Sequence, residues 1–268
     1  MRNNYFVPFK GNHGQLIDLS DDEFPSSLLA WLDGTLHLED KGTHFGYVHS
    51  GEVIIEASIG SFTLKRGMYF SLPEEGVLSG CGQGIVITRL DFKGVFMVGG
   101  PIEEAGRLRY IDGCTDSLLV PPVLKGDPCL NALYFHSGIK QTQHSHPSMR
   151  VGIIASGSGE CITPVENVPL TAGQIFMIPA ESLHSFNTTH HPMVVIAYHP
   201  DSDFGPTHEI HPMVNRTMIK GVQPPDSETS VRAVKASSAM RKDENKHRRS
   251  SPKIVRELLL LLLGTPCE

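Results

Sequence analysis

Residues 138–157 read GIKQTQHSHPSMRVGIIASG, with two histidines one residue apart and an arginine four residues after the second. Side chains alternate between the two faces of an extended strand, so His144 and His146 are expected on the same side. Two neutral imidazoles at this interval can bind one metal ion. The stretch therefore predicts a pair of metal ligands on an extended segment.

A third histidine, His184, belongs to a second segment marked by glycine and proline, GQIFMIPAESLHSFN at residues 173–187. An antiparallel return of this length can place His184 beside the first pair. Three imidazoles on one side of a cation leave coordination positions open, which is the arrangement of reactive metal sites. We therefore predict that His144, His146 and His184 bind one divalent metal ion.

Short β-rich runs separated by glycine and proline fill the chain up to about residue 221. Examples are EVIIEASIG, GIVITRLDF, LNALYFHSG and MVVIAYHP. Their β-branched and aromatic content predicts an antiparallel all-β architecture. Long helical periodicity is missing from this part of the sequence.

Three marker residues recur at a constant offset of 106 residues. The markers of the first half and their counterparts in the second are Gly51, Gly67 and Pro73, then Gly157, Gly173 and Pro179. An aromatic residue, Phe70 or Phe176, also follows each second glycine by three positions. The repetition predicts two copies of one β domain.

Both histidine segments resemble the motifs of the cupin superfamily. The first motif is Gly, five residues, His-x-His, three or four residues, Glu, six residues, Gly, and residues 138–157 reproduce its intervals. The second is Gly, five residues, Pro-x-Gly, two residues, His, three residues, Asn. Residues 173–187 follow it, with Glu181 in place of the inner glycine and Asn187 one position early.

The resemblance implies an all-β fold of two tandem cupin barrels, each a double-stranded β-helix or jelly roll. We assign residues 1–100 to an N-terminal degenerate barrel and residues 101–221 to a C-terminal metal-binding barrel. The positions 106 residues before the three histidines and Arg150 are Leu38, Asp40, Leu78 and His44. This set cannot form the same cage, and His44 is expected at the surface or in a turn.

Residues 222–268 differ in composition from the rest of the chain. They are polar and carry more basic than acidic side chains. The rest of the chain carries more acidic than basic side chains, and the net charge of the whole chain is −6. We predict a disordered tail that ends in one short helix in the leucine-rich stretch SSPKIVRELLLLLLG.

Composition also bears on partners and location. An acidic body argues against a nucleic-acid partner, and no segment reaches the roughly 18 apolar residues that a membrane-spanning helix requires. The five cysteines form no CxxC pair, which fits reduced thiols in a cytoplasmic protein. The resemblance to cupins further implies a homodimer.

Arg150 stands where the cupin motif has its glutamate ligand. A guanidinium has no lone pair for a metal and stays protonated in proteins. The site is therefore expected to be three-histidine and positively charged, so that a small anionic substrate binds the metal through a carboxylate held by Arg150. In the alternative, Arg150 forms an ion pair with a neighbour such as Glu160 or Glu181 and does not contact the ligand.

Two neighbouring residues near the end of MVVIAYHP are further candidates. Tyr198 and His199 point to opposite faces of a strand, so one of them faces the cavity as an acid, base or hydrogen-bond donor. Parity alone does not decide between them. The candidate catalytic residues are therefore Arg150, His199 and Tyr198.

The resemblance implies three possible functions. In the first, Fe(II), preferred over zinc, manganese or nickel, takes part in a dioxygenase-like oxidation of a small organic acid. In the second, the metal acts as a Lewis acid in an isomerase or lyase. The third is a non-enzymatic protein that binds or senses a small molecule.

Overall fold

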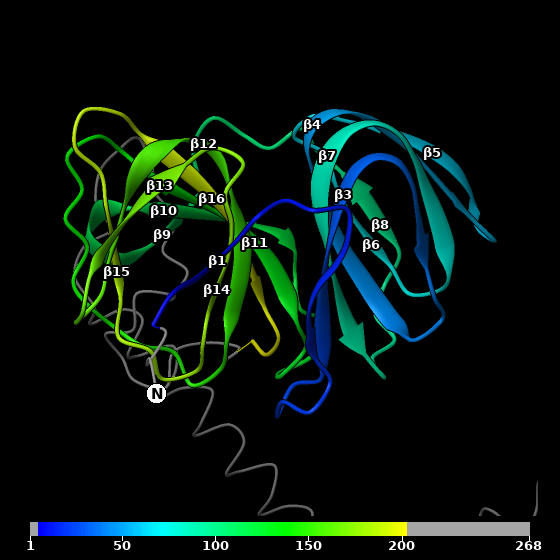
Figure 1. Cartoon of the computed structure of the whole chain (residues 1–268), viewed down its shortest axis with the longest axis horizontal. Coiled ribbons are helices and arrows are strands. Elements are labelled where there is room, and N and C mark those ends of the chain that lie inside the picture. The colour runs from blue at the N-terminus through cyan, green and yellow to red at the C-terminus, as the bar shows by residue number, and fades with distance from the viewer. Residues whose placement is uncertain (1–4, 203–268) are drawn as a thin grey trace, which may run out of the picture. The chain divides into compact units, whose positions relative to one another are not determined.

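The computed structural model describes residues 5–202. The tail and helix expected from residue 222 onward lie outside the described residues. Within them the chain forms two antiparallel β-sheets, one for most of each half of the sequence (Figure 1), and one short 3-10 turn at Ile111–Gly113. The prediction of an all-β cupin jelly-roll fold is confirmed. None of the described residues form a helix that is long and apolar enough to span a bilayer.

The first sheet has seven strands in the order β2-β3-β7-β4-β6-β8, with β5 beside β4. Its strands are β2 (Gly14–Leu19), β3 (Ser26–Leu38), β4 (Gly42–Ala57), β5 (Gly60–Lys65), β6 (Tyr69–Leu72), β7 (Gly76–Leu90) and β8 (Met97–Gly99). The long strand β7 hydrogen-bonds to β3 on one side and to β4 on the other along most of its length. They form the frame of the N-terminal barrel.

The second sheet has nine strands, in the order β1-β14-β12-β16-β11-β10-β9, with β13 and β15 beside β12. Its strands are β1 (Val7–Phe9), β9 (Leu108–Arg109), β10 (Thr115–Val120), β11 (Cys129–Phe135), β12 (Arg150–Ile162), β13 (Asn167–Thr171), β14 (Ile175–Ile178), β15 (Ser185–Asn187) and β16 (Met193–His199). β1 comes from the start of the chain, yet it pairs with β14, with Val7 opposite Met177. Figure 1 shows this first strand among those of the second sheet. Residues 7–9 therefore complete the C-terminal barrel.

The repeat seen in the sequence is also a repeat of hydrogen bonds. The amide of Gly67 donates to the carbonyl of Val48 at 2.8 Å, and 106 residues later the amide of Gly173 donates to the carbonyl of Ile154 at 2.8 Å. Both glycines have a positive φ, 83° and 87°, where a side chain would be strained. The same offset separates the bounds of β6 from those of β14. The two halves therefore share the same local backbone arrangement around this turn and strand.

One apolar cluster draws buried residues from both sheets. It includes Leu28 and Phe45 from the first sheet and Leu130 and Tyr198 from the second, all at most 1% exposed. The rings of Phe45 and Tyr198 lie 5.4 Å apart between centroids. Burial of apolar surface in this cluster stabilises the contact between the barrels.

His44 is buried in β4, so the expectation that it lies at the surface or in a turn is wrong. The side chain is 2% exposed because β4 has β6 on one side and β7 on the other. Its Nε2 donates to the carbonyl of Glu39 at 3.0 Å, which leaves Nδ1 to accept from the hydroxyl of Thr88 at 2.8 Å. Leu38 and Leu78 are core residues. This part of the N-terminal barrel is therefore an apolar core around one buried histidine whose two ring nitrogens both have hydrogen-bond partners.

The buried His44 makes the stability of the fold depend on pH. Burial lowers the pKa of His44 from 6.5 to about 4. Between these two pKa values the unfolded chain binds a proton that the folded chain does not. The contribution of neutral His44 to the unfolding free energy is therefore fully present above pH 6.5 and is lost as the pH falls toward the folded-state pKa. We predict that His44→Leu reduces the loss of unfolding free energy between pH 7 and pH 5 by about 2 kcal/mol.

Urea unfolding at the two pH values measures this difference. The matched control is His191→Leu, because His191 is exposed and its replacement should leave the pH dependence as it is in the wild type. An equal pH dependence in His44→Leu and the wild type would contradict the assignment of a neutral, buried His44.

Candidate metal centre

Two loops of the second barrel carry the three histidines, and backbone hydrogen bonds join these loops. His144 and His184 exchange both amide-to-carbonyl bonds, each 2.9 Å long, as one isolated antiparallel pair. The amide of Glu181 donates to the carbonyl of His146 at 2.7 Å. The segment around His146 is a loop rather than the predicted strand, because Pro147 follows and has no amide hydrogen to continue a ladder. All three candidate ligands are nevertheless fixed to one another through the backbone.

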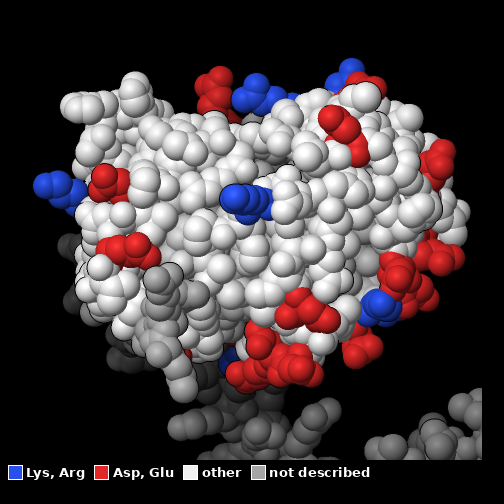
Figure 2. Space-filling model, in the orientation of Figure 1, with Lys and Arg blue, Asp and Glu red and all other residues white. Residues whose placement is uncertain are grey.

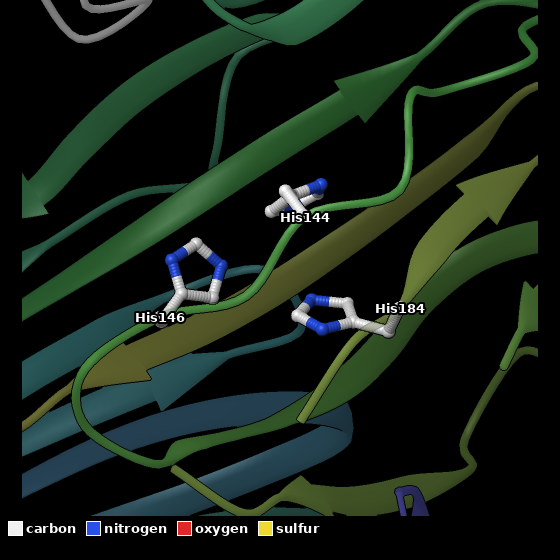
Figure 3. A group of neighbouring side chains, drawn as sticks. All are labelled: His144, His146 and His184. Atoms are coloured by element: carbon white, nitrogen blue, oxygen red, sulfur yellow. The ribbon is translucent and has the colours of Figure 1, made fainter. Parts of the chain in front are cut away.

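The three imidazole rings point toward one another (Figure 3). One ring nitrogen of each histidine lies within 4.8 Å of the corresponding nitrogen of the other two. The ring centroids are 4.7 Å apart for His144 and His184, 5.0 Å for His144 and His146, and 5.3 Å for His146 and His184. A metal–imidazole bond is roughly 2.0–2.1 Å long, so three nitrogens this close together can share one ion once the rings adjust around it. The geometry therefore fits a shared metal ion.

Hydrogen bonds fix the tautomers of two ligands. Nδ1 of His144 lies 2.8 Å from the carbonyl oxygen of Thr142, and Nδ1 of His184 lies 2.8 Å from that of Ser182. A carbonyl oxygen only accepts, so each Nδ1 carries the hydrogen and each Nε2 keeps a free lone pair. A ligating histidine in proteins commonly donates its other N–H in this way. The donor set fits a divalent metal.

The environment also keeps these imidazoles neutral. Burial lowers the pKa of His184 to about 4, and burial together with the charge of Arg150 lowers the pKa values of His144 and His146. Neutral imidazole is the form that binds metal, because a proton competes for the same lone pair. The site is therefore ready to bind a metal at neutral pH without first losing protons.

Arg150 begins β12 and is anchored by its own neighbourhood. Its Nη1 donates to the hydroxyl of Ser148 at 2.6 Å and to the carbonyl oxygens of Ser148 and Met149 at 3.1 and 2.9 Å. The carboxylate of Asp201 lies 3.7 Å from Nη1 and also accepts the hydroxyl of Ser148. Burial lowers the pKa of Arg150 and Asp201 counteracts this shift, so the guanidinium stays charged.

Arg150 forms the ion pair that the alternative expected, but with a neighbour other than the two glutamates given as examples. Arg150 pairs with Asp201, whereas Glu160 and Glu181 are exposed and make no ion pair with it. The pairing with Asp201 does not remove Arg150 from the site, because its side chain still lines the pocket of the histidines. The structure therefore shows Arg150 both in an ion pair and in the lining of the histidine pocket.

A pocket with about 340 Å³ of empty space, part of it open to solvent, surrounds the histidines. It is lined by Tyr110, Leu133, Gln141, His144, His146, Arg150, Phe176, Ile178, His184, Phe186, Ala197 and His199. None of these side chains is acidic. By contrast, acidic side chains lie on the outer surface of the molecule, and in this view most of them are on the side of the first sheet (Figure 2). The pocket is a positive, carboxylate-free site in an acidic protein.

The structure decides between the two candidates at the end of β16. His199 lines the pocket, with its ring 6.3 Å from that of His146, and burial together with Arg150 holds the pKa of His199 well below its ordinary value. Tyr198 points the other way and is fully buried against Phe45. This placement is at odds with a catalytic role for Tyr198, because it lies in the apolar cluster shared by the barrels.

Two polar residues of the pocket were not predicted. Gln141 and Tyr110 line it beside the histidines. Tyr110 immediately precedes the 3-10 turn, and Gln141 lies in the irregular loop before His144. Neither segment is a strand, so side chains do not alternate between two faces there. The sequence pattern therefore does not predict that these two residues face the pocket.

No protein-family model and no curated protein sequence matches this chain. Solved structures with the cupin fold do resemble it. The "Cupin 2 conserved barrel domain protein" of Leptotrichia buccalis is 11% identical with a TM-score of 0.51, covering 74% of this chain and 90% of its own. Protein Ylba of E. coli is 17% identical with a TM-score of 0.54, covering 75% and 94%. Salicylate 1,2-dioxygenase of Pseudaminobacter salicylatoxidans is 12% identical with a TM-score of 0.50, covering 69% and 75%.

At sequence identities this low, the similarity to these structures shows the fold alone. The neighbours are cupin-domain proteins, as the two sequence motifs predicted. The chain therefore has the cupin fold, and its second sheet carries a three-histidine group with the geometry of a metal site.

We predict that His146→Ala removes most of the bound metal. Loss of a direct ligand should weaken metal binding by more than the roughly 10- to 100-fold that loss of an outer-shell partner costs. Metal content of the purified chain, measured by mass spectrometry after loading with Co(II), tests this. The control His191→Ala changes an exposed histidine and should keep the wild-type content. Full metal content in His146→Ala would contradict the ligand assignment.

Proposed function

We propose that this chain is a metal-dependent cupin enzyme that oxidises a small organic acid with dioxygen. The observation that carries the proposal is the convergence of three neutral imidazoles in a buried pocket whose lining contains Arg150 and no carboxylate. Three protein ligands leave coordination positions for a substrate and a second small molecule. Such an open site is suited to catalysis rather than to holding the fold together.

The charge of the pocket supports an anionic substrate. A divalent ion bound by three neutral imidazoles keeps its full charge, and the Arg150 guanidinium adds to it. A carboxylate offsets the charge of the metal, which a neutral or cationic ligand leaves uncompensated, and it can also accept from Arg150, whose charge Asp201 partly balances.

The residues around the histidines have separate tasks in this proposal. Asp201 and Ser148 hold Nη1 of Arg150, so the charge stays in a fixed place. His199 is neutral and can donate one hydrogen bond to the bound acid while it accepts another. The side chains of Phe176, Ile178 and Phe186 limit the access of water to the pocket.

Fe(II) is the metal we favour, because a redox-active ion supplies the one-electron chemistry with dioxygen that side chains lack. Salicylate 1,2-dioxygenase has the same fold, and one structure of that enzyme holds gentisate. These neighbours support a small acid as substrate and dioxygen as the second reactant.

We predict that the chain loaded with Fe(II) takes up dioxygen when a hydroxylated aromatic acid or a thiol acid is added. His184→Ala should lower the rate of uptake by at least about 100-fold, because an open site loses one of its three anchors. His191→Ala should keep the wild-type rate, because that histidine is exposed. An oxygen electrode gives both rates.

Two results would contradict the proposal. Zinc or manganese bound stoichiometrically, with turnover of an acid but without oxygen uptake, would show Lewis-acid chemistry of the isomerase or lyase kind. A chain that binds acids but no metal would be a binding or sensing protein.

A further inference from the structure

The side chain of Gln141 is held in one orientation beside the histidines. Its Oε1 accepts the backbone N–H of Phe186 at 3.0 Å, and its own backbone N–H donates to Oδ1 of Asn187 at 3.1 Å. A flipped amide would direct its NH₂ group at the N–H of Phe186, so the contact with Phe186 fixes which end is oxygen. The residue is 6% exposed. Gln141 is therefore preorganised by β15.

This orientation leaves a buried donor without an acceptor. Nε2 of Gln141 has no hydrogen-bond partner within the described residues 5–202, although it is buried and its residue lines the histidine pocket. A buried amide donor without a partner costs roughly 1–3 kcal/mol. Such a group at a pocket can donate to an acceptor that arrives with the ligand.

Arg150 offers a second donor of the same kind. Its Nη1 is occupied by Ser148 and Met149, but its Nε is buried and has no partner in the same described range. The residue is 9% exposed and lines the pocket together with Gln141. Two residues with an unpartnered N–H donor therefore line one pocket, next to three imidazoles that can hold a cation.

We propose that Gln141 Nε2 and Arg150 Nε bind the carboxylate of the acid that reaches the metal, and that Gln141 sets the preference for a carboxylate. This inference rests on the proposed function, because it concerns the substrate of that site. A carboxylate has two oxygens and about four acceptor positions, enough for a metal ion and both donors. A neutral metal ligand such as imidazole offers these donors no acceptor once its lone pair is on the metal.

The test measures binding of glycolate to the full chain loaded with Co(II), by isothermal titration and by the visible absorption of the ion. We expect Gln141→Leu to weaken glycolate binding about 10-fold. Gln141→Glu keeps the acceptor for the Phe186 N–H and replaces the donor by an acceptor oxygen, so it should weaken binding about 100-fold. Binding of imidazole to the metal should stay within about twofold in both variants.

Gln143→Leu is the matched control, because Gln143 is the same residue type two positions later and is exposed. It should bind glycolate as the wild type does. Equal glycolate affinity of the wild type and Gln141→Glu, or no glycolate binding by the wild type, would overturn the inference. Failure of the proposed function would be seen separately, as a wild-type chain that takes up no Co(II). In that event glycolate titration of the metal-free chain still compares Gln141→Glu with the wild type.

Discussion

The reciprocal backbone pairing of His144 with His184 is the constraint on which the site depends. Two loops that start from different strands are joined by this pair and by the bond from the Glu181 amide to the His146 carbonyl. Loops are costly to order, and a metal site built on free loops would have to offset that entropy at binding. Here the barrel has ordered the backbone, and carbonyl oxygens have fixed two of the ring tautomers. Only ring rotations remain for the metal to select.

The second constraint is the exchange of a carboxylate for a guanidinium at residue 150. In the cupin motif this position supplies an anionic ligand, which lowers the charge of the bound metal. Arg150 does the opposite, and Asp201 holds it without entering the pocket lining. Because no acidic side chain lines the pocket, only a ligand could offset the charge of a metal ion bound there. Burial lowers the pKa values of the three histidines most, and Arg150 lowers them further, so the neutral state of the imidazoles is favoured.

The sequence predicted the fold and the three histidines because both depend on spacing. Glycine positions with positive φ recur with the repeat, as at Gly67 and Gly173, and they mark turns that a side chain would strain. Contacts between residues far apart in the sequence do not leave a recurring spacing of this kind. Asp201 follows β16 and reaches Arg150 at the start of β12, and β1 pairs with a strand of the other barrel. The loop before His144 has no strand parity, which concealed Gln141.

X-ray absorption at the metal edge of the loaded wild-type chain tests the central claim most directly, because it counts the nitrogen ligands without assuming a reaction. The account predicts three imidazole ligands at roughly 2.0–2.1 Å, completed by oxygen from water or an added acid. A first shell with fewer than three imidazoles, or one that contains sulfur, would contradict it.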